Sequence, residues 1–475
     1  MKHLDYLLCA LSLTFPYYGL SAGYPGVPIR NQLDQTTFGV DEPGTSTDVD
    51  LGYAIYRGSY NATVDRTDFL GVRYAAPPIG TLRFQAPMPP ERVRQSEDCL
   101  FLNVFVSGQV KKSEKLPVLV WIHGGGYVLG SSAMHPAESF VSEADGGLVV
   151  VVVQYRLGMF GFLSGAEVKE KGALNAGLLD QRRALVWVQD YIHLFGGDPE
   201  RVTIWGESAG AGSVMQHMIA HGGNSPTKLF SNLITSSIFF PHQYKYNDPI
   251  PEKIYLESLR AAGCQDAIDR FRCLADSDTE TLQKVNFAVN SAGFSWTFLF
   301  TPVVDNEYII EHPLRTSLRR QFNGRKLLAV TNSLEGSSGR NNRGSDVHMS
   351  YIYGFINVFR GCIQGSVRHS PGNHASDLQY YMPGANLPII NDELFENAEF
   401  IASFDSGFLG LAKYNDLNVH PVDNVITPQW DSFDKIRYSE MLFNRTEDFK
   451  PDIHPIRTDP GLLQRCQFWE DLVML

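Results

Sequence analysis

A serine stands between two glycines in the stretch "RVTIWGESAG" at residues 201–210. Ser208 has Gly206 two positions before it and Gly210 two positions after it, and an apolar run leads into the turn. A strand that ends in Gly-x-Ser-x-Gly and opens a helix makes a sharp, strained turn that exposes the serine hydroxyl. The glycines remove side chains that would collide across this turn. The pattern predicts that Ser208 is a nucleophile.

A serine nucleophile needs a base, and its tetrahedral intermediate needs donors that stabilise negative charge. The stretch "WIHGGGYVLG" at residues 121–130 also follows an apolar run and carries three consecutive glycines. Such glycines let backbone N–H groups approach an oxyanion, and this arrangement accompanies the serine turn. Ala209, directly after the nucleophile, supplies a further N–H.

The acid and the base are expected to follow the serine in the order acid, then histidine. Glu335 comes directly after the apolar run "KLLAVTN", at the end of a predicted strand, where α/β sheets present functional groups. Asp346 is the alternative acid. His374 lies in a loop-like stretch, "PGNHASDL", and His369 is the alternative base; three further histidines beyond Glu335 are His348, His420 and His454.

The elements that would position these residues alternate between apolar strands and helical patterns. "KLPVLVWIH", "GLVVVVVQY", "RVTIWG", "LFSNLITSS" and "RKLLAVTN" read as strands. "GLLDQRRALVWVQDYIHLF" and "ESAGAGSVMQHMIAH" read as helices. Strands that are apolar throughout are typical of a parallel sheet covered on both faces. We therefore predict an α/β fold with a mostly parallel central sheet and helices on both faces.

The N-terminus reads as a secretory signal peptide over residues 1–22, with cleavage after Ala22. A single domain over residues 23–475 is expected, and secretion would make the protein extracellular. The other apolar runs are shorter than the roughly 20 residues that a membrane helix needs. The net charge is −12, and Lys and Arg cluster only in the short "LRR" at 318–320, which argues against a nucleic-acid partner.

Secretion makes the six cysteines and two glycosylation sequons interpretable. Cys9 would leave with the signal peptide, so the mature chain would carry an odd number of thiols. Cys264 and Cys273 flank a short polar segment and are predicted to form a disulfide, while the pairing of Cys99, Cys362 and Cys466 stays open. Asn61 and Asn444 begin Asn-x-Thr sequons and are predicted glycan acceptors on surface loops.

The chain resembles the type-B carboxylesterase and lipase family, the cholinesterase-like branch of the α/β-hydrolases. The resemblance rests on long stretches from about residue 24 to the end: "GVRYAAPPIGTLRFQAP", "SEDCLFLNVFV", "LPVLVWIHGGGYVLGS", "YRLGMFGFLS", "NAGLLDQRRALVWVQDYIHLFGGDPERVTIWGESAGAGSV" and "ITPQW". Secreted fungal esterases are the most similar members, especially in "HASDLQYYMPG" and "EMLFN".

This resemblance implies a serine esterase that works through a covalent acyl-enzyme. The triad would be Ser208, His374 and Glu335, where the sequence matches the family's Glu-Gly pair and its catalytic histidine. The N–H groups of Gly125, Gly126 and Ala209 would form the oxyanion hole. The implied partner is a small-molecule ester, and no metal or organic cofactor is expected.

Aromatic residues alternate in "GFSWTFLFTPVVDNEYI", at Phe294, Trp296, Phe298 and Phe300. Period-2 spacing places them on one face of an extended segment, which fits a core-facing strand. The resemblance offers a second interpretation, because relatives place acyl-pocket aromatics just before a "PVxD" sequence, where Phe298 and Phe300 stand. Two rings beside Ser208 would favour short acyl chains.

The sequence departs from the family pattern in two places. A stretch before Arg94, which forms the lid in lipases and carries the usual partner of Cys99, is missing. Only 38 residues separate Glu335 from His374, where relatives insert far more, and residues 349–359 are expected to supply the strand between them. These gaps keep an alternative open, namely a non-catalytic binding homologue or a truncated, impaired product.

Overall fold

The structure of the protein is a computed structural model that describes residues 47–90, 99–293, 297–333, 335, 362–367, 373–385, 394–433 and 437–474. Several sequence predictions fall outside the described residues: the signal peptide 1–22, Phe294, Trp296, and the alternatives Asp346 and His369. The domain boundaries 23–475 therefore stay a prediction. Residues from Thr47 onward belong to one unit.

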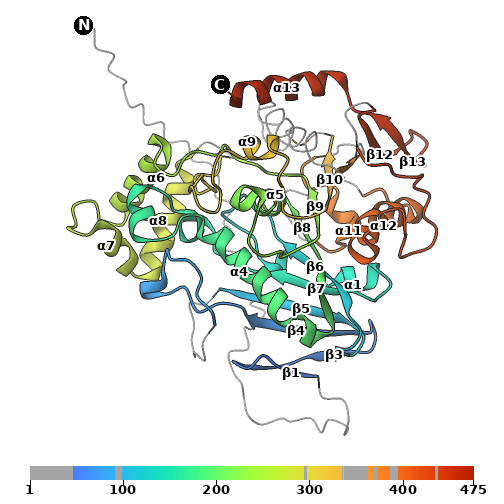
Figure 1. Cartoon of the computed structure of the whole chain (residues 1–475), viewed down its shortest axis with the longest axis horizontal. Coiled ribbons are helices and arrows are strands. Elements are labelled where there is room, and N and C mark those ends of the chain that lie inside the picture. Colours follow the sequence, from blue (N-terminus) through green and yellow to red (C-terminus); the bar gives the residue numbers. More distant parts are fainter. Residues whose placement is uncertain are drawn as a thin grey trace, which may run out of the picture. The chain divides into compact units, whose positions relative to one another are not determined.

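An eleven-stranded sheet carries the fold of this unit (Figure 1). Its strands are β3 (Ser59–Asn61), β4 (Arg66–Arg73), β5 (Phe101–Ser107), β6 (Leu116–Ile122), β7 (Val149–Val153), β8 (Gly197–Glu207), β9 (Asn232–Ser236), β10 (Lys326–Asn332), β11 (Cys362–Val367), β12 (Ser439–Arg445) and β13 (Pro451–Arg457). A separate antiparallel pair consists of β1 (Asp48–Asp50) and β2 (Ile55–Arg57).

The strand order in the sheet is β13-β12-β11-β10-β9-β8-β6-β7-β5-β4-β3. Seven neighbouring strands, from β12 to β7, pair in parallel. The remaining strands at the two edges pair antiparallel. The predicted mostly parallel α/β fold is therefore confirmed, and every strand predicted from an apolar run is present.

The central strands are apolar throughout because both faces of the sheet are covered. Along β6, Val118, Val120 and Ile122 belong to one core cluster, whereas Leu119 and Trp121 belong to another. Successive side chains of a strand point to opposite faces, so the two clusters lie on opposite sides of the sheet. The first cluster takes in side chains of α4 (Ala176–Tyr191) and α5 (Ala209–Gly223). The second takes in side chains of α1 (Ser139–Glu143), α11 (Leu378–Tyr381) and α12 (Ala398–Tyr414).

The helices are α1 (Ser139–Glu143), α2 (Gly158–Phe162), α3 (Ala166–Lys171), α4 (Ala176–Tyr191), α5 (Ala209–Gly223), α6 (Pro249–Ala261), α7 (Arg270–Asp276), α8 (Thr279–Ser291), α9 (Pro313–Leu318), α11 (Leu378–Tyr381), α12 (Ala398–Tyr414) and α13 (Pro460–Met474). The two predicted helices correspond to α4 and α5. Among the described residues, no helix combines the length and the apolar character needed to cross a bilayer.

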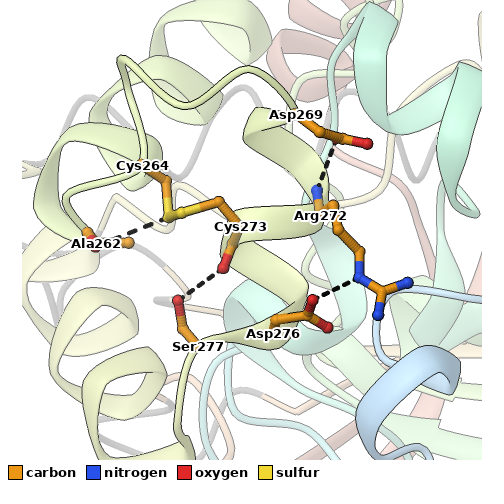
Figure 2. The surroundings of a disulfide bond; sticks show 7 residues. All are labelled: Ala262, Cys264, Asp269, Arg272, Cys273, Asp276 and Ser277. Carbon is orange, nitrogen blue, oxygen red and sulfur yellow. Dashed lines mark hydrogen bonds and ion pairs between the residues drawn. A yellow bond between two sulfur atoms is a disulfide. The ribbon is translucent and has the colours of Figure 1, made fainter.

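The predicted disulfide between Cys264 and Cys273 is present (Figure 2). It joins the loop after α6 to the middle of α7 and closes a short segment of the chain. The start of α7 is capped by Asp269, whose carboxylate accepts a hydrogen bond from the N–H of Arg272 at 3.0 Å. The cap satisfies one of the free N–H groups at a helix start, so the crosslink and the cap hold the same helical turn.

One local expectation was wrong, and another falls outside the described residues. The sequons do not lie on loops: Asn61 is the exposed last residue of β3, and Asn444 lies within β12, half-buried. The Nδ2 atom of Asn444 donates a hydrogen bond to Asp452 on β13 at 3.2 Å. The strand that pairs with β10 is Cys362–Val367, further along the chain than residues 349–359, which lie outside the described residues.

Candidate active site

Ser208 occupies the turn between β8 and α5 with a strained backbone, at φ 55° and ψ −121°. Gly206 and Gly210 must be glycines because a Cβ atom at either position would clash with neighbouring backbone. A Cβ on Gly206 would lie 2.4 Å from the carbonyl carbon of Gly210. A Cβ on Gly210 would lie 2.0 Å from the carbonyl oxygen of Ile122 on β6. Such strain persists only where surrounding structure holds it, and here the N–H of Ser208 donates to the carbonyl of Ser236 at 3.0 Å.

The structure brings Ser208, His374 and Glu335 into one hydrogen-bonded chain. Nε2 of His374 lies 2.9 Å from Oγ of Ser208, and Nδ1 of His374 lies 2.6 Å from Oε2 of Glu335. The three residues follow the carboxyl ends of β8, β11 and β10, which meet at one edge of a parallel sheet. Since a carboxylate only accepts hydrogen bonds, Nδ1 carries a proton. When the imidazole is neutral, Nε2 is therefore left to accept the serine O–H.

The second carboxylate oxygen of Glu335 is also held. Its Oε1 accepts the backbone N–H of Asn332 at 2.7 Å and the hydroxyl of Thr331 at 3.1 Å. These contacts fix the carboxylate in one orientation toward the imidazole. Sequence analysis identified Glu335 but not the two residues that hold it, because both belong to the apolar strand β10.

The charges in the site favour a protonated imidazole. Burial alone would lower the pKa of His374, but the hydrogen bond and the negative charge of Glu335 outweigh it and raise that pKa to about 9. Burial would raise the pKa of Glu335, whereas the charge and hydrogen bond of His374 bring it below its ordinary value. An imidazolium formed when Ser208 loses its proton would therefore be stabilised in place.

A further carboxyl group, not identified from the sequence, lies beside the base. Oε1 of Glu207 is 3.5 Å from Nε2 of His374, and the residue is only 2% exposed. Burial, together with the negative charges of Asp377 and Glu335, raises the pKa of Glu207 to about 8. The available signal was its position directly before Ser208, as the last residue of β8.

Asp377 forms a second polar group behind the triad. Its Oδ1 accepts from Nδ2 of Asn332 at 2.7 Å and from the hydroxyl of Ser237 at 3.3 Å, and its Oδ2 accepts from the hydroxyl of Tyr381 at 3.2 Å. Burial raises the pKa of Asp377 to about 6. Because Asn332 also holds Glu335, this network links the acid of the triad to the turn that carries His374. In the sequence, Asp377 could have been noticed because it lies only three residues after His374.

The glycine loop predicted to hold the oxyanion packs directly against the nucleophile turn. A Cβ on Gly124 would lie 2.6 Å from the carbonyl oxygen of Glu207, and Gly125 and Gly126 adopt φ values of 107° and 62°. Within the described part of the chain, no acceptor engages the N–H of Gly125 or Gly126. Ala209 is the first residue of α5, where an N–H has no partner inside its own helix.

The two predicted acyl-pocket rings occupy different surroundings. A Cβ on Gly126 would lie 2.4 Å from Cε1 of Phe298, so this half-buried ring lies on the glycine loop, and it also packs edge-on against Phe239. Phe300 is 1% exposed and belongs to the main core cluster. Residues 297–300 form no strand. The contacts of Phe298 favour the substrate interpretation, whereas those of Phe300 favour a core role.

In the described residues, no group of three or more His, Cys, Asp or Glu is arranged to hold a metal ion. Cys99 carries a free thiol, as expected when its usual family partner is missing.

Comparison with known proteins identifies the family. The model of the carboxylesterase family matches residues 90–352. The chain belongs to the carboxylesterase family. The match takes in the glycine loop, the nucleophile turn and Glu335, and it ends before His374.

Individual members of the carboxylesterase family match about half of the chain. The secreted lipase 1 of Botryotinia fuckeliana is 37% identical over 306 residues, which cover 54% of this chain and 51% of that protein. A secreted triacylglycerol lipase of Gibberella zeae is 36% identical over 269 residues, covering 46% of this chain and 45% of that protein. The chain thus spans about half the length of these curated relatives.

The crystal structure of Aspergillus niger EstA matches with a TM-score of 0.77 and 27% identity. The alignment covers 90% of this chain and 99% of that chain. The similarity of fold therefore extends well beyond the part matched by the family model, and the fold is that of the α/β-hydrolase esterases.

Proposed function

We propose that this protein is a secreted carboxylic-ester hydrolase in which Ser208 is the nucleophile, His374 the base and Glu335 the acid. One observation carries the proposal: the hydrogen bonds of 2.9 Å and 2.6 Å that join these three side chains in the order serine, histidine, glutamate. A serine that is hydrogen-bonded to a base, which is itself oriented by a third group, is the arrangement that activates a hydroxyl for acyl transfer.

In the first step Oγ of Ser208 attacks the ester carbonyl carbon while Nε2 of His374 takes the serine proton. The imidazolium is stabilised by Glu335, which also keeps the proton on Nδ1. Collapse of the tetrahedral intermediate breaks the bond to the alcohol oxygen, and His374 returns its proton to the leaving alcohol. Water then attacks the acyl-enzyme with His374 again as the base, which releases the acid and restores Ser208.

The N–H groups of Gly125, Gly126 and Ala209 would bind the negatively charged oxygen of the intermediate. Each donor of this kind is worth about 3 kcal/mol in the transition state. The positive φ of both glycines is a backbone conformation that other residues rarely adopt. A Cβ on the neighbouring Gly124 would lie 3.0 Å from Cβ of Ser208, so the loop packs closely against the nucleophile.

Short-chain esters are the substrates that the site favours. The ring of Phe298 lies on Gly126, beside the predicted oxyanion donors, and would limit the room for a long acyl chain. An added methylene in such a pocket changes discrimination by about 1–3 kcal/mol. The two relatives described above are both named as secreted lipases. Secretion is proposed for this chain on those names and on the N-terminal signal pattern.

The test is hydrolysis of a chromogenic butyrate ester by the purified full chain and by Ser208→Ala. We expect a loss of at least about 10³-fold in kcat for this variant, with unchanged thermal unfolding. Ser213→Ala is the matched control, since Ser213 lies on the same helix, is buried and accepts a hydrogen bond from Nε2 of Gln181 rather than from a triad residue. A fluorophosphonate should label Ser208 and leave Ser208→Ala unlabelled.

Two results would contradict the proposal. Turnover of Ser208→Ala at the wild-type rate would show that another group is the nucleophile. A folded wild-type protein that neither hydrolyses short esters nor reacts with the fluorophosphonate would instead support a non-catalytic binding homologue.

A further inference from the structure

Two peptides of the glycine loop, whose N–H groups are proposed to bind the oxyanion, have carbonyl oxygens that accept hydrogen bonds. The carbonyl oxygen of Gly125 accepts the backbone N–H groups of Val128 at 3.1 Å and of Leu129 at 3.0 Å. The carbonyl oxygen of Gly124 lies 2.9 Å from Nδ1 of His123. Because the C=O and the N–H of a trans peptide point in opposite directions, each of these bonds fixes the direction of the next glycine N–H.

The two peptides are held by different kinds of group. The peptide between Gly125 and Gly126 is held by the backbone of the turn that follows it, whereas the peptide between Gly124 and Gly125 is held by a side chain. The imidazole of His123 is the donor in this bond, because a carbonyl oxygen can only accept. The direction of the Gly125 N–H therefore depends on a side chain that can be replaced.

The ring of His123 is itself fixed in place. It is 0% exposed, and it stacks on the ring of Tyr155 with the centroids 4.5 Å apart and the planes at 22°. The hydroxyl of Tyr155 donates to the carbonyl oxygen of His123 at 2.8 Å. Burial lowers the pKa of His123 to about 3, so the ring is neutral and its proton is on Nδ1. A Cβ on Gly130 would lie 2.5 Å from both atoms of the His123–Gly124 bond, so the chain packs directly over it.

Loss of this hydrogen bond would favour the opposite orientation of the peptide. Gly124 is buried, and a buried carbonyl oxygen without a donor is disfavoured. Gly124 and Gly125 have no Cβ and so resist rotation of the peptide between them less than other residues would. After such a rotation the Gly124 carbonyl oxygen would take the direction of the Gly125 N–H, and it would repel the negative charge of the intermediate.

We propose that His123 is a positioning residue, whose hydrogen bond to the carbonyl oxygen of Gly124 directs the N–H of Gly125 toward the oxyanion. The inference rests on the proposed ester hydrolysis and deepens it, since it names the side chain that prepares one of the oxyanion donors. His123 acts through this peptide and takes no proton in the reaction.

The experiment compares the purified full chain with His123→Leu and His123→Asn on a chromogenic butyrate ester. Leucine offers no donor, whereas Nδ2 of asparagine is attached to Cγ, as Nδ1 of histidine is, and restores the bond. We expect kcat to fall by about 10- to 100-fold in His123→Leu, with KM changed less than about threefold, because removing a whole oxyanion donor costs about 10²- to 10³-fold. The kcat of His123→Asn should lie within about fivefold of the wild-type value, on the order of the effect of one hydrogen bond.

Inhibition by propyl trifluoromethyl ketone measures stabilisation of the oxyanion separately from turnover. Oγ of Ser208 adds to its carbonyl carbon, and the carbonyl oxygen becomes the negatively charged oxygen that the loop binds. The Ki should rise in His123→Leu by about the factor by which kcat/KM falls, because the adduct resembles the transition state.

His135→Leu is the matched control for loss of a buried ring beside the loop. His135 is 1% exposed, and its ring centroid lies 6.0 Å from that of His123. Its Nδ1 lies 3.3 Å from the carbonyl oxygen of Ser131, outside the three consecutive glycines. We therefore expect kcat and Ki to change by less than about threefold, on the order of a small packing effect.

A second pair of variants keeps the test decisive if His123→Leu does not fold. His123→Gln carries the same amide as His123→Asn but one bond further from the backbone, where it cannot replace Nδ1. High kcat in the asparagine variant and low kcat in the glutamine variant, at similar Tm, would support the proposal. It is overturned if removal of the donor leaves kcat unchanged, if asparagine is as impaired as glutamine or leucine, or if kcat falls while Ki stays constant. A folded wild type that hydrolyses no ester would contradict the proposed function, and this inference with it.

Discussion

Replacing Glu335 by glutamine should do more than remove a charge, because the surroundings dictate which way the new amide points. Oε1 of Glu335 accepts the backbone N–H of Asn332 at 2.7 Å, so the amide oxygen of a glutamine must take that place. Its NH₂ group then faces Nδ1 of His374, which is 2.6 Å from the present Oε2. Nδ1 would then have to accept a hydrogen bond from this NH₂ group, and the imidazole would carry its proton on Nε2. A protonated Nε2 cannot take the proton of Ser208.

The cost of recovering the active tautomer follows from these contacts. Turning the amide over would leave the N–H of Asn332 without an acceptor, at about 1–3 kcal/mol, and the imidazolium also loses its charged hydrogen bond to the carboxylate, at about 1.5–3 kcal/mol. We therefore expect kcat for a short ester to fall by roughly 10²- to 10⁴-fold in Glu335→Gln, at 1.36 kcal/mol for each factor of ten.

Glu335→Ala is the control that separates orientation from charge. It removes the same charge but offers no donor to Nδ1, so water can fill the space and either tautomer can form. We expect its kcat to exceed that of Glu335→Gln by about tenfold, since only the tautomer penalty differs. Steady-state kinetics on a butyrate ester decides the matter: equal or higher activity in the glutamine variant would refute the argument from the Asn332 contact.

Four further outcomes can be checked. Because the pKa of His374 is raised to about 9 and catalysis needs the neutral imidazole, kcat/KM should rise with pH across the range above 6.5, and a plateau already reached at neutral pH would contradict this. Gly210→Ala should lower the free energy of unfolding by about 1–3 kcal/mol or more, measured by denaturant titration, since its Cβ meets the carbonyl of Ile122 at 2.0 Å. Phe298→Ala should broaden the range of acyl lengths in kcat/KM, whereas Phe300→Ala, buried in the core, should mainly cost about 3–5 kcal/mol of stability; the reverse pattern would exchange their roles. With the lid stretch missing, activity on a short ester should show no jump when the substrate passes its solubility limit, and a clear jump would mean that another segment covers the site.

The sequence was sufficient for the features that depend on local patterns. Strands that are apolar throughout predicted a sheet covered on both faces, and β6 indeed divides its side chains between two core clusters. The glycines around Ser208 predicted a crowded turn, and the distances at Gly206 and Gly210 account for both. The catalytic roles themselves remain predictions, although the three side chains do meet.

Features that depend on neighbours distant in the chain were beyond the sequence. Glu207 is 167 residues before His374 in the sequence, and only the folded sheet brings the two side chains together. The strand β11, "CIQGSV", has no sustained apolar run and is a strand because it lies between β10 and β12. Asn444 looked like a loop acceptor because its sequon says nothing of its pairing with Asp452.

The strands that position the triad lie far apart in the sequence, and this affects how the protein folds during its synthesis. Ser208 and His374 are 166 residues apart, and a ribosome that adds about 5–20 residues per second needs roughly 10–30 s to pass from one to the other. For most of that interval β8 has no β10 or β11 to complete its side of the sheet, because β10 begins only at Lys326, and the strained serine turn has no histidine beside it. Since such long-range parallel pairing is also slow to form, the nascent chain would be inert toward esters until the last third of the sequence has emerged and docked.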